Sequence, residues 1–391
     1  MSNPGYIRGF DGLRAVAVFL VFIMHQSHVL YEMHVGYYGV WLFFLLSGFL
    51  INSQLHAARV AIVSGESTPK RELLAFWRRR FLRIFPAYYV LLAVTLVLYL
   101  VAGKSVAGFG FHVFYLTNVY YEYLTPEFTS IFAHFWSLAV EEQFYLLFAP
   151  LTLFVFWLPM RMTLIALVVV SLVARLVLTL FGVDEMLVYI DSFVNFGVIA
   201  LGGLTFLHRD ALAKWINPAG TSGMSVLLFA AFLASIVAID AIPADDVYLR
   251  QLAFLASILL SCAMLASILA SPSGIFTALL EWRPLAFFGR LSYGFYLYHS
   301  YFPGDLPLKA LTALGKRSPA IAALTDRIAD PAHALLASVV QIGSITVSFI
   351  LTLAITYLSW RLIEQPALRY RHARPPRGRA DPNAPMVPKA A

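Results

Sequence analysis

Three ionisable side chains of types that take part in catalysis lie within one apolar segment near the start of the chain. The segment DGLRAVAVFLVFIMHQ carries Asp11, Arg14 and His25. On an α-helix the eleven steps from Arg14 to His25 make about three whole turns and rise about 16 Å, so the two side chains share one face, about half a bilayer apart. Because isolated charges at such depth cost several kcal/mol, they usually face a cavity or partners and indicate a functional site.

His25 is a candidate catalytic residue, because histidine accepts a proton from a hydroxyl group near neutral pH. A carboxylate on a neighbouring helix would orient it. The segment HFWSLAVEEQFY supplies Glu141 and Glu142, and since adjacent helix residues point about 100° apart, at most one faces the same point. Two plainer interpretations stay open: His25 as a polar residue at the membrane interface, and Arg14 as an arginine that extends to the headgroups beside Asp11.

A second basic motif, FWRRRFLRIFPAYY, places Arg80 and Arg83 three residues apart on one helical face. Guanidinium groups bind phosphates through two parallel hydrogen bonds, so this pair is a candidate site for the phosphates of a nucleotide-bearing donor. The alternative is a basic cluster that only fixes membrane orientation, which suits Arg78 and Arg79 well. No phosphate-binding loop, dinucleotide-binding glycine pattern or zinc-ligand spacing is present, so we expect no metal.

The composition predicts an all-α polytopic membrane protein. Of 391 residues, 60% are hydrophobic and 13% are charged, which is too apolar for a soluble domain of this size. The single cysteine, Cys262, excludes an internal disulfide. We expect a bundle of about ten transmembrane helices, at roughly 11–31, 36–57, 83–102, 133–156, 161–181, 190–208, 222–240, 248–270, 283–303 and 335–361.

The charge distribution predicts the orientation. The net charge of +7 comes from basic clusters that follow every second span, and the positive-inside rule therefore places both termini in the cytoplasm. The charge accordingly reflects topology and not nucleic-acid binding. With this orientation Arg14, Arg80 and Arg83 lie in a cytoplasmic layer. His25, Glu141, Glu142 and His299 lie in an outer layer.

Two further segments have a distinct composition. The external connection 303–334 contains several prolines and an amphipathic stretch, PAIAALTDRIAD, and connections of this length are often lids or binding loops. We expect a transmembrane domain over residues 1–370 and a disordered, basic, proline-rich cytoplasmic tail over 371–391.

The ordered set of motifs resembles the acyltransferase-3 family of bacterial integral-membrane O-acyltransferases. The matching segments are FDGLRAVAVFLVFIMHQ, GVWLFFLLSGFLI, RRFLRIFPAY, FWSLAVEEQFYLL and GRLSYGFYLYHS. Each is weak alone, but together they follow the family's order across all the expected spans. The family's ten helices and cytoplasmic termini agree with the charge distribution.

The resemblance implies a multi-pass protein of the bacterial cytoplasmic membrane that transfers an acyl group, usually acetyl, from cytoplasmic acyl-CoA to a hydroxyl of a carbohydrate or lipid-linked glycan. By the same resemblance, Arg14 and His25 are essential, Arg80 and Arg83 form the second basic motif, and Glu141 is the acidic residue of the fourth span. Some relatives add a C-terminal SGNH-type hydrolase domain, which is not expected in this chain.

These implications combine into one mechanism. Arg80 and Arg83, with Arg14, would bind the acyl-CoA donor, and His25, supported by Glu141, would act as general base or as transient acyl carrier. The alternative is a transporter or flippase, because intramembrane His, Arg and Glu also serve proton relays. The absence of an internal repeat disfavours it. The sequence does not choose the acceptor, the acyl group or the oligomeric state.

Overall fold

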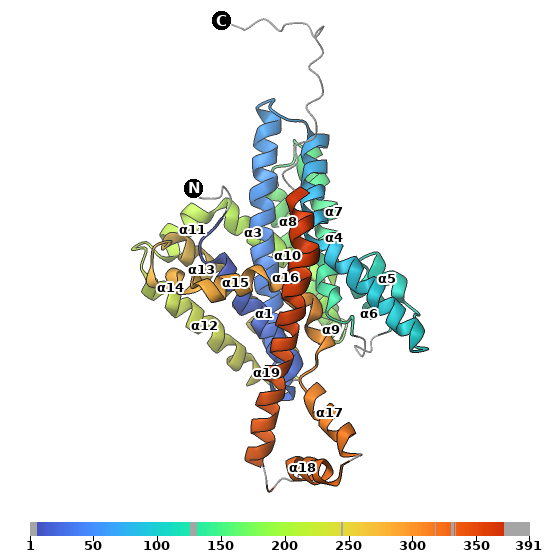
Figure 1. The fold of residues 1–391 in the computed structure, drawn as a ribbon. Helices are drawn as coiled ribbons and strands as arrows, with labels where there is room; N and C mark the ends of the chain where they lie inside the picture. Colours follow the sequence, from blue (N-terminus) through green and yellow to red (C-terminus); the bar gives the residue numbers. More distant parts are fainter. Residues whose placement is uncertain are drawn as a thin grey trace, which may run out of the picture.

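The computed structural model describes residues 6–125, 131–243, 245–316, 318–329, 332 and 334–370, and these fold into helices without a β-strand (Figure 1). The all-α polytopic prediction is thereby confirmed. The expected tail, 371–391, lies outside the described residues.

The helices follow the predicted apolar segments closely. The first half of the chain forms α1 (Phe10–Gln26), α2 (His28–Glu32), α3 (Val35–Val63), α4 (Pro69–Val101), α5 (Phe109–Val113), α6 (Thr117–Tyr123), α7 (Phe135–Phe154), α8 (Met160–Leu180), α9 (Glu185–Ile190) and α10 (Ser192–Leu207). The second half forms α11 (Arg209–Ile216), α12 (Ser222–Asp240), α13 (Val247–Ala270), α14 (Ile275–Leu280), α15 (Arg283–Arg290), α16 (Ser292–Tyr298), the 3₁₀ turn η1 (His299–Tyr301), α17 (Leu306–Gly315), α18 (Pro319–Ala329), α19 (Ala334–Ser359), the π-helical turn η3 (Trp360–Glu364) and α20 (Gln365–Arg369).

Fewer helices than expected are long and apolar enough to cross a membrane unaided. Six meet this description among the described residues, or seven if α10 and α11, which meet at 84°, form one span. The shortfall from ten has a physical reason, because polar residues interrupt the predicted spans that carry the motifs. The α1 helix ends at Gln26, α7 carries two glutamates, and 283–303 is divided between α15 and α16. The number of spans and the cytoplasmic termini stay predictions.

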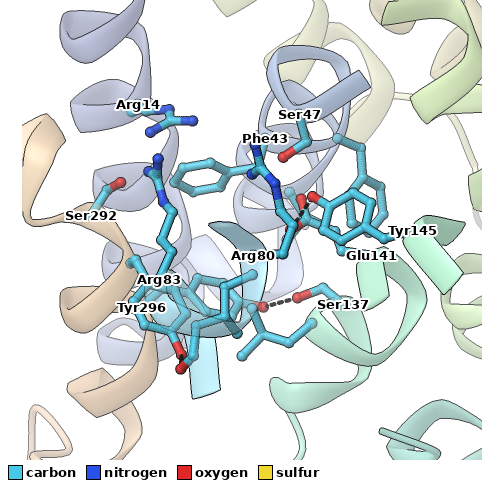
Figure 2. A pocket seen from close by; sticks show the side chains of 15 residues that line it. Arg14, Phe43, Ser47, Arg80, Arg83, Ser137, Glu141, Tyr145, Ser292 and Tyr296 are labelled. Carbon is cyan, nitrogen blue, oxygen red and sulfur yellow. Dashed lines mark hydrogen bonds between the residues drawn. The ribbon is translucent and has the colours of Figure 1, made fainter. Parts of the chain in front are cut away.

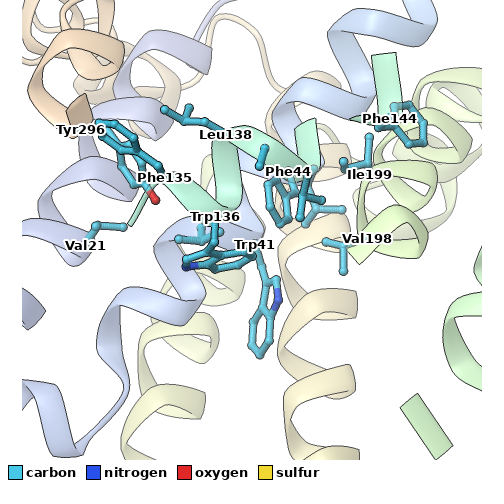
Figure 3. Packing of buried hydrophobic residues seen from close by; sticks show 14 of the residues in the cluster. Val21, Trp41, Phe44, Phe135, Trp136, Leu138, Phe144, Val198, Ile199 and Tyr296 are labelled. Carbon is cyan, nitrogen blue, oxygen red and sulfur yellow. The ribbon is translucent and has the colours of Figure 1, made fainter. Parts of the chain in front are cut away.

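The helix α3 forms the centre of the bundle and packs most extensively against α10 and α1. Figure 1 shows α12 and α13 along one flank, α5 and α6 on the opposite flank, and α17 with α18 at one end. Aromatic side chains fill the interior, including Trp41 and Phe44 of α3 and Trp136 of α7 (Figure 3). Their large buried surfaces hold these helices at fixed positions around the polar residues.

Backbones approach closely where α3 crosses α10. A Cβ atom added to Gly48 of α3 would lie 1.9 Å from the carbonyl oxygen of Ile199, and one added to Gly202 of α10 would lie 2.1 Å from that of Leu45. Small residues at such crossings allow van der Waals packing of helices in membranes, where the hydrophobic effect between helices is weak.

The helix α4 joins the second basic motif to an apolar span without a break. Its first turn is capped by Thr68, whose hydroxyl accepts a hydrogen bond from the backbone N–H of Arg71, and the helix continues through Pro86. One rigid helix therefore carries Arg80 and Arg83 into the bundle.

The segment that was expected to form an external loop is largely helical. The helices α17 and α18 form a hairpin that packs on α19, and the carbonyl oxygen of Pro303 accepts a hydrogen bond from Ser348 of α19 at 3.0 Å. This anchor holds the start of the hairpin beside the end of α1.

Gly48→Ala should destabilise the protein, because the new methyl group would overlap the Ile199 backbone and force α3 away from α10. We expect a loss of about 1–3 kcal/mol, measured as a lower unfolding temperature of the purified protein in detergent. Gly223→Ala is the matched control, since nothing lies within 4 Å of its added Cβ. Equal unfolding temperatures for the two variants would contradict the packing argument.

Candidate functional site

A cavity of about 80 Å³ opens between α1, α3, α4, α7 and α16, and we call it the arginine cavity. Three guanidinium groups line it, from Arg14, Arg80 and Arg83. Its other polar lining residues are Ser47, Ser137, Glu141, Tyr145, Ser292, Tyr293 and Tyr296. The three arginines that the sequence indicated for donor binding thus share one cavity, although they lie on two separate helices, α1 and α4.

The arginines point toward one another across the cavity (Figure 2). The positive charges of Arg83 and Arg80 repel that of Arg14. The carboxylates of Asp11 and Glu141 attract it. Asp11 itself forms an ion pair with Arg290 at 3.8 Å. Because cationic charge exceeds anionic charge among the cavity's lining residues, the arginine cavity suits a polyanionic group.

Aromatic rings hold Arg80 in place, and a tyrosine hydroxyl holds Glu141. The Arg80 guanidinium lies over the rings of Phe76 and Tyr145, 5.8 Å and 5.6 Å from their centroids, which is within the range of cation–π attraction. The Tyr145 hydroxyl donates a hydrogen bond to Glu141 at 3.1 Å (Figure 2). Glu141 is therefore the carboxylate that offsets part of the arginine charge.

A second cavity, of about 160 Å³, contains His25, and we call it the histidine cavity. The His25 side chain is solvent-accessible and lines this cavity from the last turn of α1. Its Nδ1 lies 2.8 Å from the carbonyl oxygen of Val21. A carbonyl oxygen only accepts, so Nδ1 carries the proton and Nε2 keeps its lone pair. This arrangement leaves Nε2 able to accept a proton or to attack a carbonyl carbon.

Two more histidines lie beside His25. The ring of His299 is 4.9 Å from that of His25 and 4.7 Å from that of His134. His299 donates from Nδ1 to the carbonyl of Tyr296 at 2.6 Å, and His134 donates from Nε2 to that of Leu297 at 3.3 Å. Among the described residues, no group of three His, Cys, Asp or Glu side chains has the arrangement to hold a metal ion.

Aromatic rings form much of the remaining wall of the histidine cavity. Tyr37 stacks on Tyr189 with ring centroids 3.5 Å apart, and Trp136 meets Tyr189 edge-on at 4.6 Å. Tyr31 also lines the cavity, with half of its surface exposed. The stacked rings cover each other and stiffen the wall, and Tyr31 offers an exposed ring and a hydroxyl group to a ligand.

The two cavities adjoin. Val40 and Tyr296 line both of them. The Tyr296 hydroxyl is held 2.6 Å from the Ser137 hydroxyl and donates to the carbonyl oxygen of His134 at 2.8 Å. A line of polar groups thus runs from the arginines past Tyr296 to His25.

Comparison with known proteins identifies the family. Residues 7–361 match a family model described as an acyltransferase domain, that of acyltransferase-3. The chain belongs to the acyltransferase-3 family. No solved structure matches it.

Curated relatives of this acyltransferase-3 chain are named as O-acetyltransferases. The O-acetyltransferase OatA of Staphylococcus aureus is 30% identical over 319 residues, which cover 76% of this chain and 51% of that protein. The peptidoglycan O-acetyltransferase OatA of Listeria monocytogenes is 30% identical over 325 residues, 75% of this chain and 49% of that protein. A putative peptidoglycan O-acetyltransferase of Bacillus subtilis, YrhL, is 30% identical over 317 residues, 75% of this chain and 48% of that protein. The chain spans about half the length of these relatives.

One candidate of this acyltransferase-3 chain lies elsewhere than the sequence indicated. Glu141 was expected beside His25, but it lines the arginine cavity, and His25 lines the other. The start of the fourth expected span does reach the level of His25, but the residue there is His134. Glu141 follows His134 by seven residues, which is about two turns, or 10 Å, deeper along α7. The other glutamate, Glu142, does not line either cavity.

His299 was expected near His25, and its position is confirmed. Two further candidates emerge only from the structure. His134 and Tyr296 were not singled out, although both occur within the quoted motifs HFWSLAVEEQFY and GRLSYGFYLYHS. The sequence did not indicate which aromatic residues form the wall of the histidine cavity, since aromatic residues are abundant throughout this chain.

Glu141→Gln should leave the three arginines of the arginine cavity with less compensating charge. We expect the free energy of unfolding at low salt to fall by on the order of 1–3 kcal/mol, which lowers the unfolding temperature. Inorganic pyrophosphate should then raise the unfolding temperature more than it does in the wild type. Glu66→Gln, at an exposed glutamate, is the control. An unfolding temperature and a pyrophosphate response equal to those of the wild type would refute this role.

Proposed function

We propose that the chain is a membrane O-acetyltransferase that moves acetyl from cytoplasmic acetyl-CoA to a hydroxyl of a cell-envelope carbohydrate. The observation that carries the proposal is the pair of adjoining cavities, one cationic and one with an available histidine nitrogen. The relatives named as O-acetyltransferases, two of them with peptidoglycan in their names, support the acetyl group and a glycan acceptor.

The arginine cavity fits the donor's phosphates. Arg80, Arg83 and Arg14 would bind them, since guanidinium groups pair with phosphate oxygens through charge-assisted hydrogen bonds. The narrow cavity suits the thin pantetheine arm, which extends roughly 15–20 Å by its covalent bond lengths. The helical rise of about 16 Å from Arg14 to His25 matches this reach. The thioester would thus arrive at His25 by way of Tyr296.

His25 would act on the acceptor. As a general base, its Nε2 takes the proton of the acceptor hydroxyl while the oxygen attacks the thioester carbonyl. The new C–O bond forms, the C–S bond breaks, and the leaving thiolate takes up the proton from His25. As an acyl carrier, Nε2 would itself attack the thioester, so that an N–C bond forms, the C–S bond breaks and CoA leaves as thiolate. The acceptor oxygen would then attack the acetyl carbon, the N–C bond would break, and the hydroxyl proton would pass by way of Nε2 to the thiolate. The Val21 carbonyl stabilises the required tautomer in both routes.

The histidine cavity fits the acceptor. Tyr31, with half of its surface exposed, offers an aromatic face on which the apolar face of a sugar ring packs, and His25 lies in the same cavity. The positive-inside rule would direct this cavity to the outer face of the cytoplasmic membrane and the arginine cavity to the cytoplasm. The donor and the acceptor would then enter from opposite sides. No observation favours a transporter, and membership of an acyltransferase family disfavours it.

His25→Ala should abolish transfer while the protein stays folded and binds acetyl-CoA. We expect at least a 100-fold loss of rate, the low end of what a general base contributes. The measurement follows label from radioactive acetyl-CoA onto peptidoglycan fragments with purified protein in nanodiscs. His208→Ala, which lines neither cavity, should keep full activity.

Near-normal transfer by His25→Ala would disprove the catalytic role, and label that stays on CoA with the wild type would disprove the activity. Initial-rate kinetics separate the two routes. Parallel double-reciprocal lines indicate an acyl carrier, and intersecting lines indicate direct transfer.

Arg83→Ala and Arg80→Ala should raise the KM for acetyl-CoA about tenfold or more, because each removes a phosphate contact. The KM for acetyl-pantetheine, which lacks the nucleotide phosphates, should change little. Arg71→Ala, an exposed arginine of the same helix, is the control. Equal increases for both donors would show that these arginines do not bind the nucleotide phosphates.

A further inference from the structure

A third cavity, which we call the Gln26 cavity, lies under the helical hairpin that follows the ninth expected span. It measures about 360 Å³ and is enclosed by the end of α1, by α17 and α18, and by α19. This volume falls within the range of small-molecule sites. The cavity shares none of its lining residues with the arginine or histidine cavity.

Gln26 is the unusual residue of this cavity. Its side chain is 8% exposed, and both amide atoms, Nε2 and Oε1, are buried without a hydrogen-bond partner. A buried amide without partners costs about 1–3 kcal/mol per group. Gly304 lies directly against it, since a Cβ added there would be 2.9 Å from Oε1. The fold therefore keeps an unsatisfied amide beside an open volume, which is typical of a ligand site.

The rest of the lining defines the chemistry of the ligand. Its one carboxylate, Asp305, is paired with Lys309 at 2.8 Å, so the lining has no uncompensated charge and suits a neutral ligand. Thr312 and Thr325 donate their hydroxyl protons to backbone carbonyls and keep lone pairs for a ligand donor. Leu308, Ile328, Ala337 and Val340 supply an apolar wall. A lining that combines an amide, hydroxyl groups and apolar side chains suits a neutral ligand with both polar and apolar groups, such as an N-acylated sugar.

The position of the cavity connects it to the reaction. Gln26 follows His25 directly, and consecutive helix residues point about 100° apart. One end of α1 thus presents His25 to the histidine cavity and Gln26 to this one. From this geometry we propose that the Gln26 cavity binds an N-acylated sugar unit of the acceptor glycan, next to the unit that is acetylated. This inference rests on the proposed function and adds recognition of the neighbouring unit.

The test compares two acceptor trisaccharides, chitotriose, which carries N-acetyl groups, and cellotriose, which does not. With full-length wild-type protein and acetyl-CoA, kcat/KM should be at least tenfold higher for chitotriose. Gln26→Leu keeps the side-chain size and removes the amide, so this ratio should fall about tenfold. Gln341→Leu, in the same lining, should lower the ratio as well and replaces Gln26→Leu if that variant does not fold.

Gln54→Leu is the matched control. The Gln54 Oε1 is also buried without a partner, but the residue lies on α3 and lines none of the three cavities. This variant should keep the wild-type ratio. A wild-type ratio near one, or an unchanged ratio in both Gln26→Leu and Gln341→Leu, would overturn the inference.

Calorimetric binding of chitotriose without a donor separates this inference from the proposed function. Binding that is lost in Gln26→Leu, together with no acetyl transfer by the wild type, would refute the transferase and retain the sugar site. Transfer to both trisaccharides at equal rates would retain the transferase and refute the sugar site.

Discussion

The structure depends on keeping three guanidinium groups together inside an apolar bundle. Arg14, Arg80 and Arg83 repel one another, and Glu141, with Asp11 close by, offsets only part of their charge. In a low-dielectric interior such an imbalance is costly unless aromatic faces, fixed carboxylates and an anionic ligand compensate for it. The rings of Phe76 and Tyr145 and the Glu141 carboxylate supply the internal part of this compensation. The proposed polyanionic donor would supply the remainder and would thereby couple the stability of the bundle to occupation of the site.

Close helix packing makes this arrangement rigid. The crossing of α3 and α10 at Gly48 and Gly202 leaves no room for a side chain, so α3 is fixed relative to the remainder of the bundle. Ser47 lies next to that crossing, on the arginine cavity, and Val40 lies two turns away between the two cavities. Small shifts of α3 would therefore change the line from the arginines to His25. Helix packing and site geometry are parts of one structural problem in this protein.

The end of α1 positions the residues of the other two cavities. The helix stops at Gln26, where Ser27 takes an extended conformation, well short of the span that its apolar composition indicates. The last turn consequently lies beside three neighbours: the ring of His299, the aromatic rings of the histidine cavity, and the α17–α18 hairpin. Because the hairpin is tied to α19 through the Ser348 hydrogen bond to Pro303, the proposed chemistry at His25 and the proposed recognition at Gln26 would share one short turn of helix.

The sequence by itself determined the helical class, the approximate helix bounds, the joint position of Arg14 and His25 on one helix face, and the family. These properties follow from the periodicity and length of apolar segments and from the order of the motifs. Each of these can be read within single segments of the chain. Tertiary structure alone decided that Glu141 belongs with the arginines and that His134 takes its expected place beside His25. The reason is depth, since a displacement of two turns along α7 moves a side chain from one cavity to the other, and no local pattern fixes the axial position of α7 against α1. The same holds for Tyr296 and the Gln26 cavity, which exist only where separate helices meet.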